Sequence, residues 1–218
     1  MKLLCLSDIH GEGAALKEVL AEAAAADAVI LAGDITHLGG YEEAEALLEP
    51  LLSAGFPVFA VGGNMDTEGA RRFLRDKGID LHARGVMVGT VGFLGLGGGT
   101  PSPFHTPWEL SDDEARGFLS AGLAQIPDAA FKVLVSHAPP RGTKIDRSFA
   151  GLHAGSGAVR EFVLSGAVNL CISGHIHEAP GEENLGNALC VNLGPFKNGR
   201  YALITIEGSD PKVSWRKR

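Results

Sequence analysis

Apolar residues recur at helical spacing in five segments of the chain. In residues 13–26, Leu16, Val19 and Ala23 stand at positions i, i+3 and i+7, so they share one face of an α-helix. The same spacing predicts further helices over residues 41–49, 67–77, 111–123 and 156–164. Each of these helices would bury one apolar face against a neighbouring element.

Residues at the ends of these segments indicate where the helices begin and end. Pro50 has no N–H group and its ring clashes with the preceding turn, so the second helix is expected to end or kink near Glu49. Gly78 is a typical stop signal for the third helix. Ser111 is followed three residues later by Glu114, which is the signature of a capping box at the start of the fourth helix.

Short runs rich in Val, Ile and Leu separate the predicted helices. They cover residues 3–7, 28–33, 57–62, 131–135 and 168–173. Strands that alternate with helices are typical of a largely parallel sheet. The first part of the chain and the segment from residue 131 onward are therefore both expected to contribute parallel strands.

Two regions break this alternation. Residues 85–97 and 188–215 read as successive strands with glycine turns and no helix between them. We therefore predict an α/β fold in which the strands form two mixed sheets. With 218 residues, of which 45% are hydrophobic and 21% charged, the chain can bury a sizeable core. No linker or low-complexity segment divides it, so we expect residues 1–218 to form a single domain.

Polar side chains stand where five of the apolar runs end. In an open α/β sheet, ligands gather beyond the carboxyl ends of the strands, so we expect these side chains to converge in one crevice. A lone Asp-x-His or His-x-His pair is more often a loop or core feature than a pair of ligands. Here, however, four of the chain's eight histidines fall at strand ends. The full set is Asp8, His10, Asp34, Asn64, His137, His175 and His177.

Four imidazoles, two carboxylates and one amide exceed the donor count of a single tetrahedral ion, which takes about four. Two ions fit better, and a carboxylate can bridge two cations that lie about 3.5–4 Å apart. Nitrogen-rich coordination favours Mn, Fe, Co or Zn over Mg or Ca. The residues do not select among the four, and manganese is our working expectation for the two divalent ions.

The charges of the proposed site and of the whole chain indicate which substrates the protein could bind. Two divalent ions contribute about +4, and two aspartates with a bridging hydroxide remove about three charges, so the site should attract an anion. A bridging hydroxide that attacks a phosphoester is the chemistry that such a pair of ions supports. The chain as a whole carries a net charge of −7. This charge counts against a long nucleic acid as partner and favours a small phosphoester, such as a nucleotide.

The motifs at these strand ends resemble those of the calcineurin-like metallophosphoesterase superfamily, and in particular of its small prokaryotic Icc-like members. The superfamily signature of D-x-H, G-D, G-N-H-[DE], H and G-H-x-H is matched in order between residues 8 and 177. The matching segments are Asp8-Ile9-His10, Gly33-Asp34, Gly63-Asn64-Met65-Asp66, His137 and Gly174-His175-Ile176-His177.

The resemblance implies a four-layer fold, in which two mixed sheets pack as a sandwich flanked by helices. It also implies how the ligands are divided between the metals. Asp8, His10, Asp34 and His177 would hold one ion. Asp34, Asn64, His137 and His175 would hold the other, so that Asp34 bridges the two.

Met65 departs from the superfamily pattern, because the superfamily usually has a histidine here that protonates or stabilises the leaving oxygen. A thioether has no proton to donate. Some members that lack this histidine are phosphodiesterases with poor activity on monoesters, so we expect a preference for diesters. The alternative is a metal-binding scaffold or regulatory protein of the same fold with little catalytic activity.

Further residues are candidates for roles around the metals. Asn64, Asp66 and His153 are the catalytic candidates, and Asn64, His153 and Ser156 are the candidates for substrate binding. Ser156 stands at the predicted start of a helix, where backbone N–H groups suit a phosphate, and His153 could supply the proton that Met65 cannot. His37 is a weaker candidate for contact with substrate.

Two further expectations concern the environment of the protein. Cys5, Cys171 and Cys190 all stand in apolar runs, so we expect buried thiols and no disulfide. No run approaches the roughly 18 apolar residues of a membrane span, and charged residues follow soon after Met1. We therefore expect a cytoplasmic protein without a membrane partner. The sequence leaves the oligomeric state open.

Overall fold

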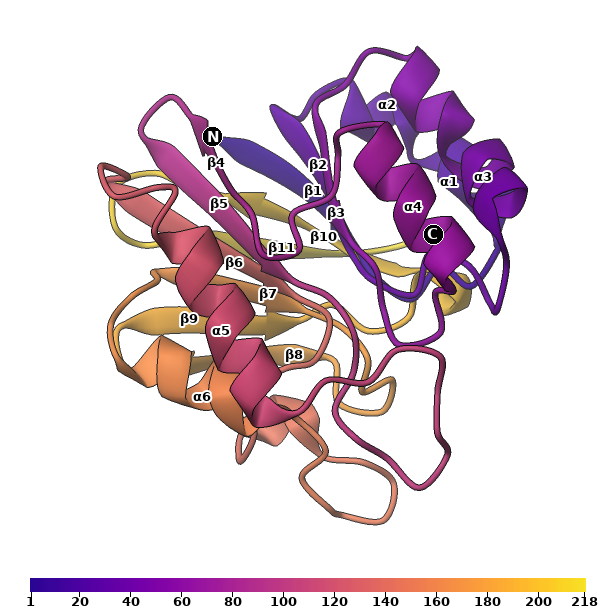
Figure 1. Ribbon diagram of the computed structural model, residues 1–218. Coiled ribbons are helices and arrows are strands. Elements are labelled where there is room, and N and C mark those ends of the chain that lie inside the picture. The colour runs from indigo at the N-terminus through magenta and orange to yellow at the C-terminus, as the bar shows by residue number, and fades with distance from the viewer.

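The computed structural model describes residues 1–218, except for the side chain of Leu20. Its strands form two sheets that face each other, with helices on the outer faces (Figure 1). The first sheet has the spatial order β11 (Lys212–Lys217), β10 (Arg200–Thr205), β1 (Lys2–Leu6), β2 (Ala28–Ala32) and β3 (Val58–Val61). The second has the order β4 (Gly85–Val88), β5 (Val91–Leu96), β6 (Phe131–Ser136), β7 (Leu170–Ser173), β9 (Ala188–Asn192) and β8 (Gly181–Leu185).

Both sheets are mixed, as the sequence predicts. Strands β1, β2 and β3 run parallel to one another, and so do β5, β6, β7 and β9. The remaining strands, β11, β10, β4 and β8, pair antiparallel with their neighbours. Every residue of β2 and of β7 is buried, because parallel strands covered on both faces need no polar side.

Three layers of apolar side chains hold the fold together. One fills the space between the first sheet and the helices α1 (Gly13–Glu18), α3 (Tyr41–Ser53) and α4 (Glu68–Asp76). A second lies between the two sheets. The third lies between the second sheet and the helices α5 (Asp112–Leu123) and α6 (Gly157–Leu164). This arrangement is the four-layer sandwich that the resemblance implies.

The helix starts follow the sequence signals. The side chain of Thr67 caps α4, and Ser111 and Glu114 form a complete capping box at the start of α5. The three cysteines are buried and free, as predicted. None of the helices in the described part of the chain has both the length and the hydrophobicity needed to cross a bilayer.

The predicted helix over residues 13–26 is interrupted. The structure has α1, then Val19 in a non-helical conformation, then the short helix α2 (Leu20–Ala23). The N–H of Val19 donates to the carbonyl of Leu16, three residues back, which tightens the turn at this point. Leu16, Val19 and Ala23 are nevertheless all buried, so the predicted apolar face is correct although the helix is not continuous.

Helix α3 continues through Pro50 to Ser53, so the predicted end near Glu49 is wrong. The proline leaves the carbonyl of Ala46 without its helical donor, but Ala46 is exposed and water can take that place. Leu48 and Leu51, on either side of Pro50, are buried in the layer beneath the helix. Burial of these side chains outweighs the lost hydrogen bond.

Strand β8 is absent from the sequence prediction. Its residues, Gly-Glu-Glu-Asn-Leu, have low strand propensity, and the strand forms because it pairs with β9 across the turn at Gly186. Gly186 has a φ of +60°, which suits glycine in such a turn.

We expect the variant Pro50→Ala to raise the free energy of unfolding by about 1 kcal/mol or more, because it restores the N–H donor for Ala46. Urea denaturation at neutral pH measures this change. Glu49→Ala, at the neighbouring exposed position, is the control and should change stability by less than about 0.5 kcal/mol. A less stable Pro50→Ala protein would show that the proline is favourable in this helix.

Candidate metal centre

The seven predicted donors lie at the carboxyl ends of strands from both sheets. Asp8, Asp34 and Asn64 follow β1, β2 and β3 of the first sheet. His137 and the His175–His177 segment follow β6 and β7 of the second. Backbone hydrogen bonds join neighbouring ends within each sheet: the N–H of Asp8 donates to Gly33 and the N–H of Gly174 donates to His137. Across the sheets, the N–H of His175 donates to Asp8 Oδ2 at 3.1 Å. The two sheets therefore present their donors at one common rim.

Four of these donors have a backbone conformation that is rare for residues with a side chain. Asp8, His10, Asp34 and His175 have φ values of 54°, 49°, 49° and 68°. A left-handed conformation costs roughly 1 kcal/mol or more for a residue other than glycine, and such strain is concentrated at functional sites. Here it turns the chain sharply at the strand ends, and the side chains of Asp8, His10 and Asp34 point toward one another.

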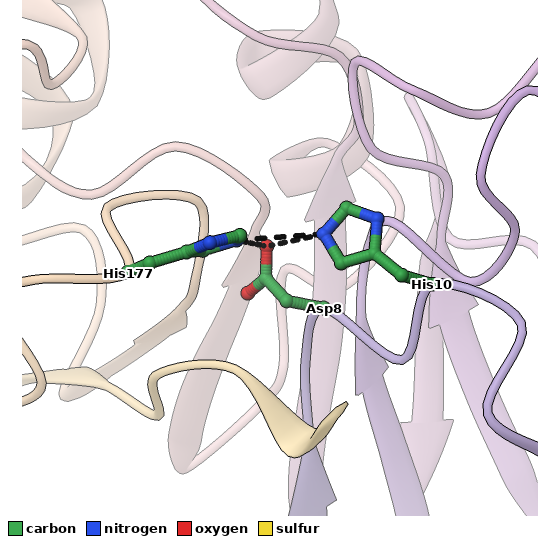
Figure 2. A group of neighbouring side chains, drawn as sticks. All are labelled: Asp8, His10 and His177. Atoms are coloured by element: carbon green, nitrogen blue, oxygen red, sulfur yellow. Dashed lines mark hydrogen bonds and ion pairs between the residues drawn. The ribbon is translucent and has the colours of Figure 1, made fainter. Parts of the chain in front are cut away.

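Asp8, His10 and His177 form the first donor group (Figure 2). His177 Nε2 lies 3.0 Å from Asp8 Oδ1 and 3.4 Å from His10 Nε2. Two imidazole nitrogens and one carboxylate oxygen therefore converge on one point. This set of donors fits a divalent transition metal, which imidazole and carboxylate ligands both suit.

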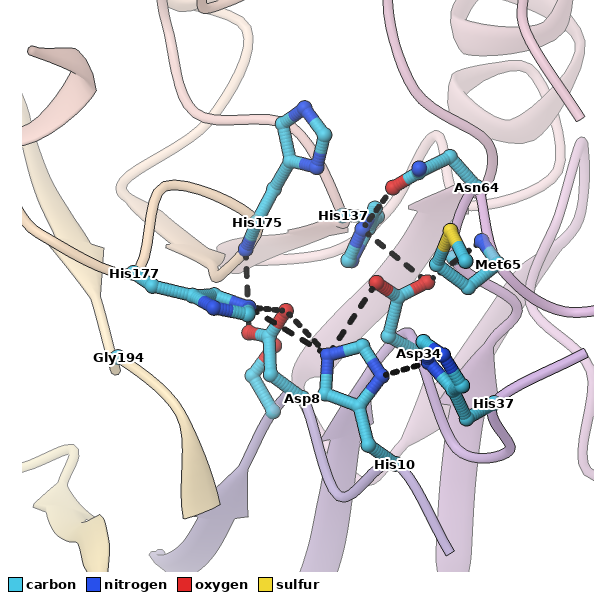
Figure 3. A network of polar contacts seen from close by, with 12 residues as sticks. Asp8, His10, Asp34, His37, Asn64, Met65, His137, His175, His177 and Gly194 are labelled. Atoms are coloured by element: carbon cyan, nitrogen blue, oxygen red, sulfur yellow. Dashed lines mark hydrogen bonds and ion pairs between the residues drawn. The ribbon is translucent and has the colours of Figure 1, made fainter. Parts of the chain in front are cut away.

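Asp8, Asp34 and His137 form the second donor group, and Asn64 contacts it (Figure 3). His137 Nε2 lies 3.5 Å from Asp34 Oδ1 and 2.9 Å from Asn64 Oδ1. The other carboxylate oxygen of Asp34, Oδ2, lies 3.7 Å from His10 Nε2. Asp34 thus directs one oxygen toward His10 and the other toward His137, and Asp8 is common to both donor groups, so both carboxylates lie between the two sets of imidazoles.

His175 is placed less directly than the other predicted ligands. Its backbone N–H donates to Asp8 Oδ2 at 3.1 Å, while its ring projects away from Asp8 (Figure 3). The ring packs against that of His137, with 4.9 Å between the ring centroids. His175 is therefore next to the second donor group, although its ring nitrogens are not part of the two groups that converge within 4.8 Å.

The buried charges of this centre compensate one another. Burial favours the neutral form of Asp8, but the hydrogen bond with His177 and the charge of His137 hold its pKa below the ordinary value. Burial disfavours the charged form of His137, yet Asp34 and Asp8 raise its pKa to about 9. The pKa of His175 falls to about 4, chiefly because its ring is buried. A divalent cation would take over the compensating role of the protonated His137.

Asp66, one of the predicted catalytic residues, holds backbone segments together, and its catalytic role stays a prediction. Its side chain is fully buried and accepts hydrogen bonds from the backbone of Ile35, Thr36 and Gly63, and from the Thr36 hydroxyl. Burial and the nearby charge of Asp34 raise its pKa to about 6. Both carboxylate oxygens are engaged in joining the loops that carry Asp34 and Asn64, so Asp66 positions those ligands.

Ser156, a candidate for substrate binding, is bonded within the protein, and its predicted role stays a prediction. It is buried at the start of α6, where its hydroxyl accepts from the N–H of Val159. Asp112 of α5 occupies the place predicted for a phosphate, because its carboxylate accepts from the N–H of Ala158 at 2.9 Å and from the Ser156 hydroxyl at 3.4 Å. A carboxylate at this helix start would repel a second anion.

The two candidate histidines lie in different places. His37 is exposed beside Met65 and Asp34, and its Nδ1 lies 3.4 Å from Nδ1 of His10 (Figure 3). His153 lies on the loop before α6, with its Nδ1 2.6 Å from Asp146 Oδ1. The predicted catalytic and substrate-binding roles of His153 stay predictions at this point.

Sequence reasoning missed Ser7, which supports the first donor group. Its hydroxyl donates to Asp8 Oδ2 at 2.6 Å and lies 3.0 Å from the carbonyl of Ala32. Ser7 is fully buried between β1 and β2. A small polar residue at the very end of a buried strand is the only sequence signal that could have indicated this role.

The chain is similar to proteins of a known family. Residues 1–179 match the family model described as calcineurin-like phosphoesterase. The chain is 32% identical over 201 residues to the uncharacterized protein MJ1162 of Methanocaldococcus jannaschii, with 89% of this chain and 88% of that protein covered.

Solved structures share the fold. The crystal structure of TT1561 of Thermus thermophilus superposes with a TM-score of 0.78 at 19% identity, over 98% of this chain and 97% of that one. A dimetal phosphatase from Danio rerio superposes with a TM-score of 0.73 at 14% identity, over 100% of this chain and 96% of that one.

We expect the variant Gly174→Ala to weaken metal binding by about tenfold or more and to lower the free energy of unfolding by about 1–3 kcal/mol. An added Cβ would collide with Ser7 Oγ and Asp8 Oδ2, so the segment that carries His175 and His177 would have to shift. Metal titration and urea denaturation measure the two effects.

Gly117→Ala is the matched control. Gly117 is exposed within α5, and a Cβ added there meets no atom within 4 Å. This variant should bind metal normally and gain about 0.5–1 kcal/mol in stability. Unchanged metal affinity in Gly174→Ala would show that close packing at this glycine does not position the ligands.

Proposed function

Because the chain belongs to the calcineurin-like phosphoesterase family, we propose that it is a metal-dependent hydrolase of phosphodiesters with a dinuclear centre. Asp8, His10, Asp34 and His177 would hold one ion, and Asp34, Asn64, His137 and His175 the other. The substrate would be a small diester, such as a nucleotide derivative, and manganese is the metal we expect.

One observation carries the dinuclear proposal. The two oxygens of Asp34 face different imidazoles, since Oδ2 is 3.7 Å from His10 and Oδ1 is 3.5 Å from His137. A mononuclear site would have no use for a carboxylate directed at two donor groups. When bound, a pair of divalent ions acidifies water and stabilises the charge on a phosphoryl group.

The protein's own residues prepare the crevice for an anionic substrate. The Met65 N–H donates to Asp34 Oδ1 at 2.8 Å and fixes the orientation of the carboxylate. Asn64 is oriented by the contact between its Oδ1 and His137, which leaves its amide N–H₂ group to donate to a phosphoryl oxygen. Asp66 joins the loops behind these residues, so that Asn64 and Asp34 keep a fixed separation.

The proposed preference for diesters rests on Met65. This residue lies beside Asp34 and Asn64, and its thioether has no proton to donate, so a proton for the leaving oxygen would have to come from another residue (Figure 3). The same observation supports the second candidate, a metal-binding protein of this fold with little turnover. Metal binding without metal-dependent hydrolysis of any phosphodiester would favour that candidate.

Purified protein should bind two transition-metal ions per chain, and Asp34→Asn should remove at least one ion and most of the hydrolytic activity. Asp34 is the only ligand that we assign to both ions, so its charge stabilises both. Elemental analysis and assays on bis(4-nitrophenyl) phosphate measure these effects. Asp128→Asn, at an exposed position, is the control. Active wild-type protein with a single ion per chain would contradict the dinuclear centre.

The variant Met65→His should raise kcat/KM for diesters with basic leaving groups by about tenfold or more, and should have a smaller effect on 4-nitrophenyl esters. A positioned acid contributes about 10²–10⁴-fold where the leaving oxygen needs a proton. The measurement is the dependence of log kcat/KM on the pKa of the leaving group. Equal slopes for the variant and the wild type would show that position 65 does not reach the leaving oxygen.

A further inference from the structure

Asp146 and His153 form a hydrogen-bonded pair outside the two donor groups. The Asp146 side chain is completely buried, and its Oδ1 lies 2.6 Å from His153 Nδ1. Its carboxylate also accepts from the backbone N–H groups of Gly142, Thr143 and Gly155. These bonds fix the position of the carboxylate, and thereby the orientation of the imidazole.

The pair also determines which nitrogen of His153 is available. An ionised carboxylate only accepts hydrogen bonds, so Nδ1 carries the proton that faces Asp146. Nε2 then points away from Asp146, and the side chain is 34% exposed. When the ring carries a proton on both nitrogens, a histidine held in this way can donate the proton on Nε2 to a group that approaches from solvent.

The loop that carries the pair is attached to three segments of the candidate metal centre. Near His137, the N–H of Ser156 donates to the carbonyl of Pro139 at 2.9 Å. Next to His177, Glu178 accepts from the N–H of Phe149 at 2.9 Å. These two contacts fix the loop along the rim formed by the second sheet.

The third attachment runs toward Asn64. The hydroxyl of Thr100 donates to the carbonyl of Ala154, the residue after His153, at 3.1 Å. Gly99, the residue before Thr100, packs so closely on Asn64 that an added Cβ would lie 2.8 Å from the Asn64 Cβ. The loop is thus attached to segments that carry proposed ligands of both ions.

The histidine is not needed to hold this loop. Asp146 already joins Gly142, Thr143 and Gly155 through backbone N–H groups. The antiparallel bridge between Arg147 and His153 adds a further backbone pairing that is independent of the imidazole. A purely structural role would therefore leave the partly exposed ring without a purpose, whereas a proton donor must be both oriented and accessible.

We propose that His153, oriented by Asp146, is the general acid that protonates the leaving oxygen of the diester. The proposal rests on the function proposed above. The oxygen of a hydroxide ion, formed when a water molecule loses a proton to solvent, makes a new bond to phosphorus while the bond from phosphorus to the leaving oxygen breaks. The electron pair of the broken bond stays with the leaving oxygen, which takes the proton from His153 Nε2. The imidazole is left neutral and regains a proton from solvent.

The test compares two methyl aryl phosphodiesters, one with 4-nitrophenol and one with phenol as leaving group. His153→Gln should lose about 10²-fold in kcat on the phenyl ester and less than about threefold on the 4-nitrophenyl ester, because only the more basic phenolate needs the proton. Added imidazole should restore part of the activity of His153→Ala on the phenyl ester. His105→Gln, at an exposed loop position, is the control and should resemble the wild type.

Asp146 is a positioning residue, so its variant needs a different readout. Asp146→Asn should lower kcat on the phenyl ester and leave KM unchanged. In ¹H–¹⁵N spectra of the metal-free protein, the Nδ1 proton of His153 should be protected from exchange in the wild type and lose that protection in Asp146→Asn. His153→Gln retains Asp146 and its backbone partners, so it tests the acid even if Asp146→Asn folds poorly.

The outcomes separate this proposal from the function on which it rests. Equal losses on both esters in His153→Gln, or no loss on either, would overturn the role of His153 while leaving a metal-dependent hydrolase. Wild-type protein without metal-dependent hydrolysis of the 4-nitrophenyl ester would overturn the proposed function itself, and this inference with it. If His153 and a histidine at position 65 protonate the same leaving oxygen, Met65→His should raise kcat on the phenyl ester more in the His153→Gln variant than in the wild type.

Discussion

The burial of two carboxylates, Asp8 and Asp34, at the ends of adjacent parallel strands is the constraint on which the rest of the site depends. Charged groups in such a position are costly unless hydrogen bonds and opposite charges compensate them. Ser7 and the backbone of His175 donate to Asp8, and the backbone of Met65 donates to Asp34. Protonated His137 supplies a positive charge in the metal-free protein. These groups come from strand ends of both sheets, so compensation requires the two sheets to meet at one rim.

Backbone geometry serves the same requirement. The left-handed conformations of Asp8 and Asp34 turn the chain immediately after β1 and β2. Asp66, which is buried, accepts from the backbone of Ile35 and Gly63 and so joins the loop after β2 to the loop after β3. Gly33, Gly63 and Gly174 stand where any Cβ would collide with the buried donors. The strained turns at Asp8 and Asp34 are therefore held in place by close packing, which leaves no room for a Cβ at these three glycines.

The second sheet contributes more than ligands. The loops after β5 and β6 also carry residues other than the proposed ligands. The hydrogen bond from Thr100 to Ala154 joins these two loops. Within the second of these loops, Asp146 fixes the backbone and the orientation of the His153 ring. Asp8, Asp34 and His137 are buried, whereas the side chain proposed to act on the leaving oxygen is 34% exposed. This division suits a site in which ligands must be immobile and a proton must be exchanged with solvent.

The sequence by itself determined the layered α/β fold and the set of strand-end donors, because strand periodicity, capping boxes and the residue that follows a strand are local features. It also predicted that Asp34 would be shared, through the resemblance carried by its motifs. The tertiary structure alone decided features that depend on residues distant in sequence. Packing of Leu48 and Leu51 carries α3 through Pro50, and pairing with β9 creates β8 from a segment of low strand propensity. Asp66 stands in a motif of the family, but its partners Ile35 and Thr36 lie about 30 residues earlier in the chain, so only the folded protein shows which backbone groups it binds. Ser156 faces Asp112 from another helix, which no local pattern indicates. Local sequence thus specified which chemical groups reach the rim, and long-range packing decided which of them are free to act.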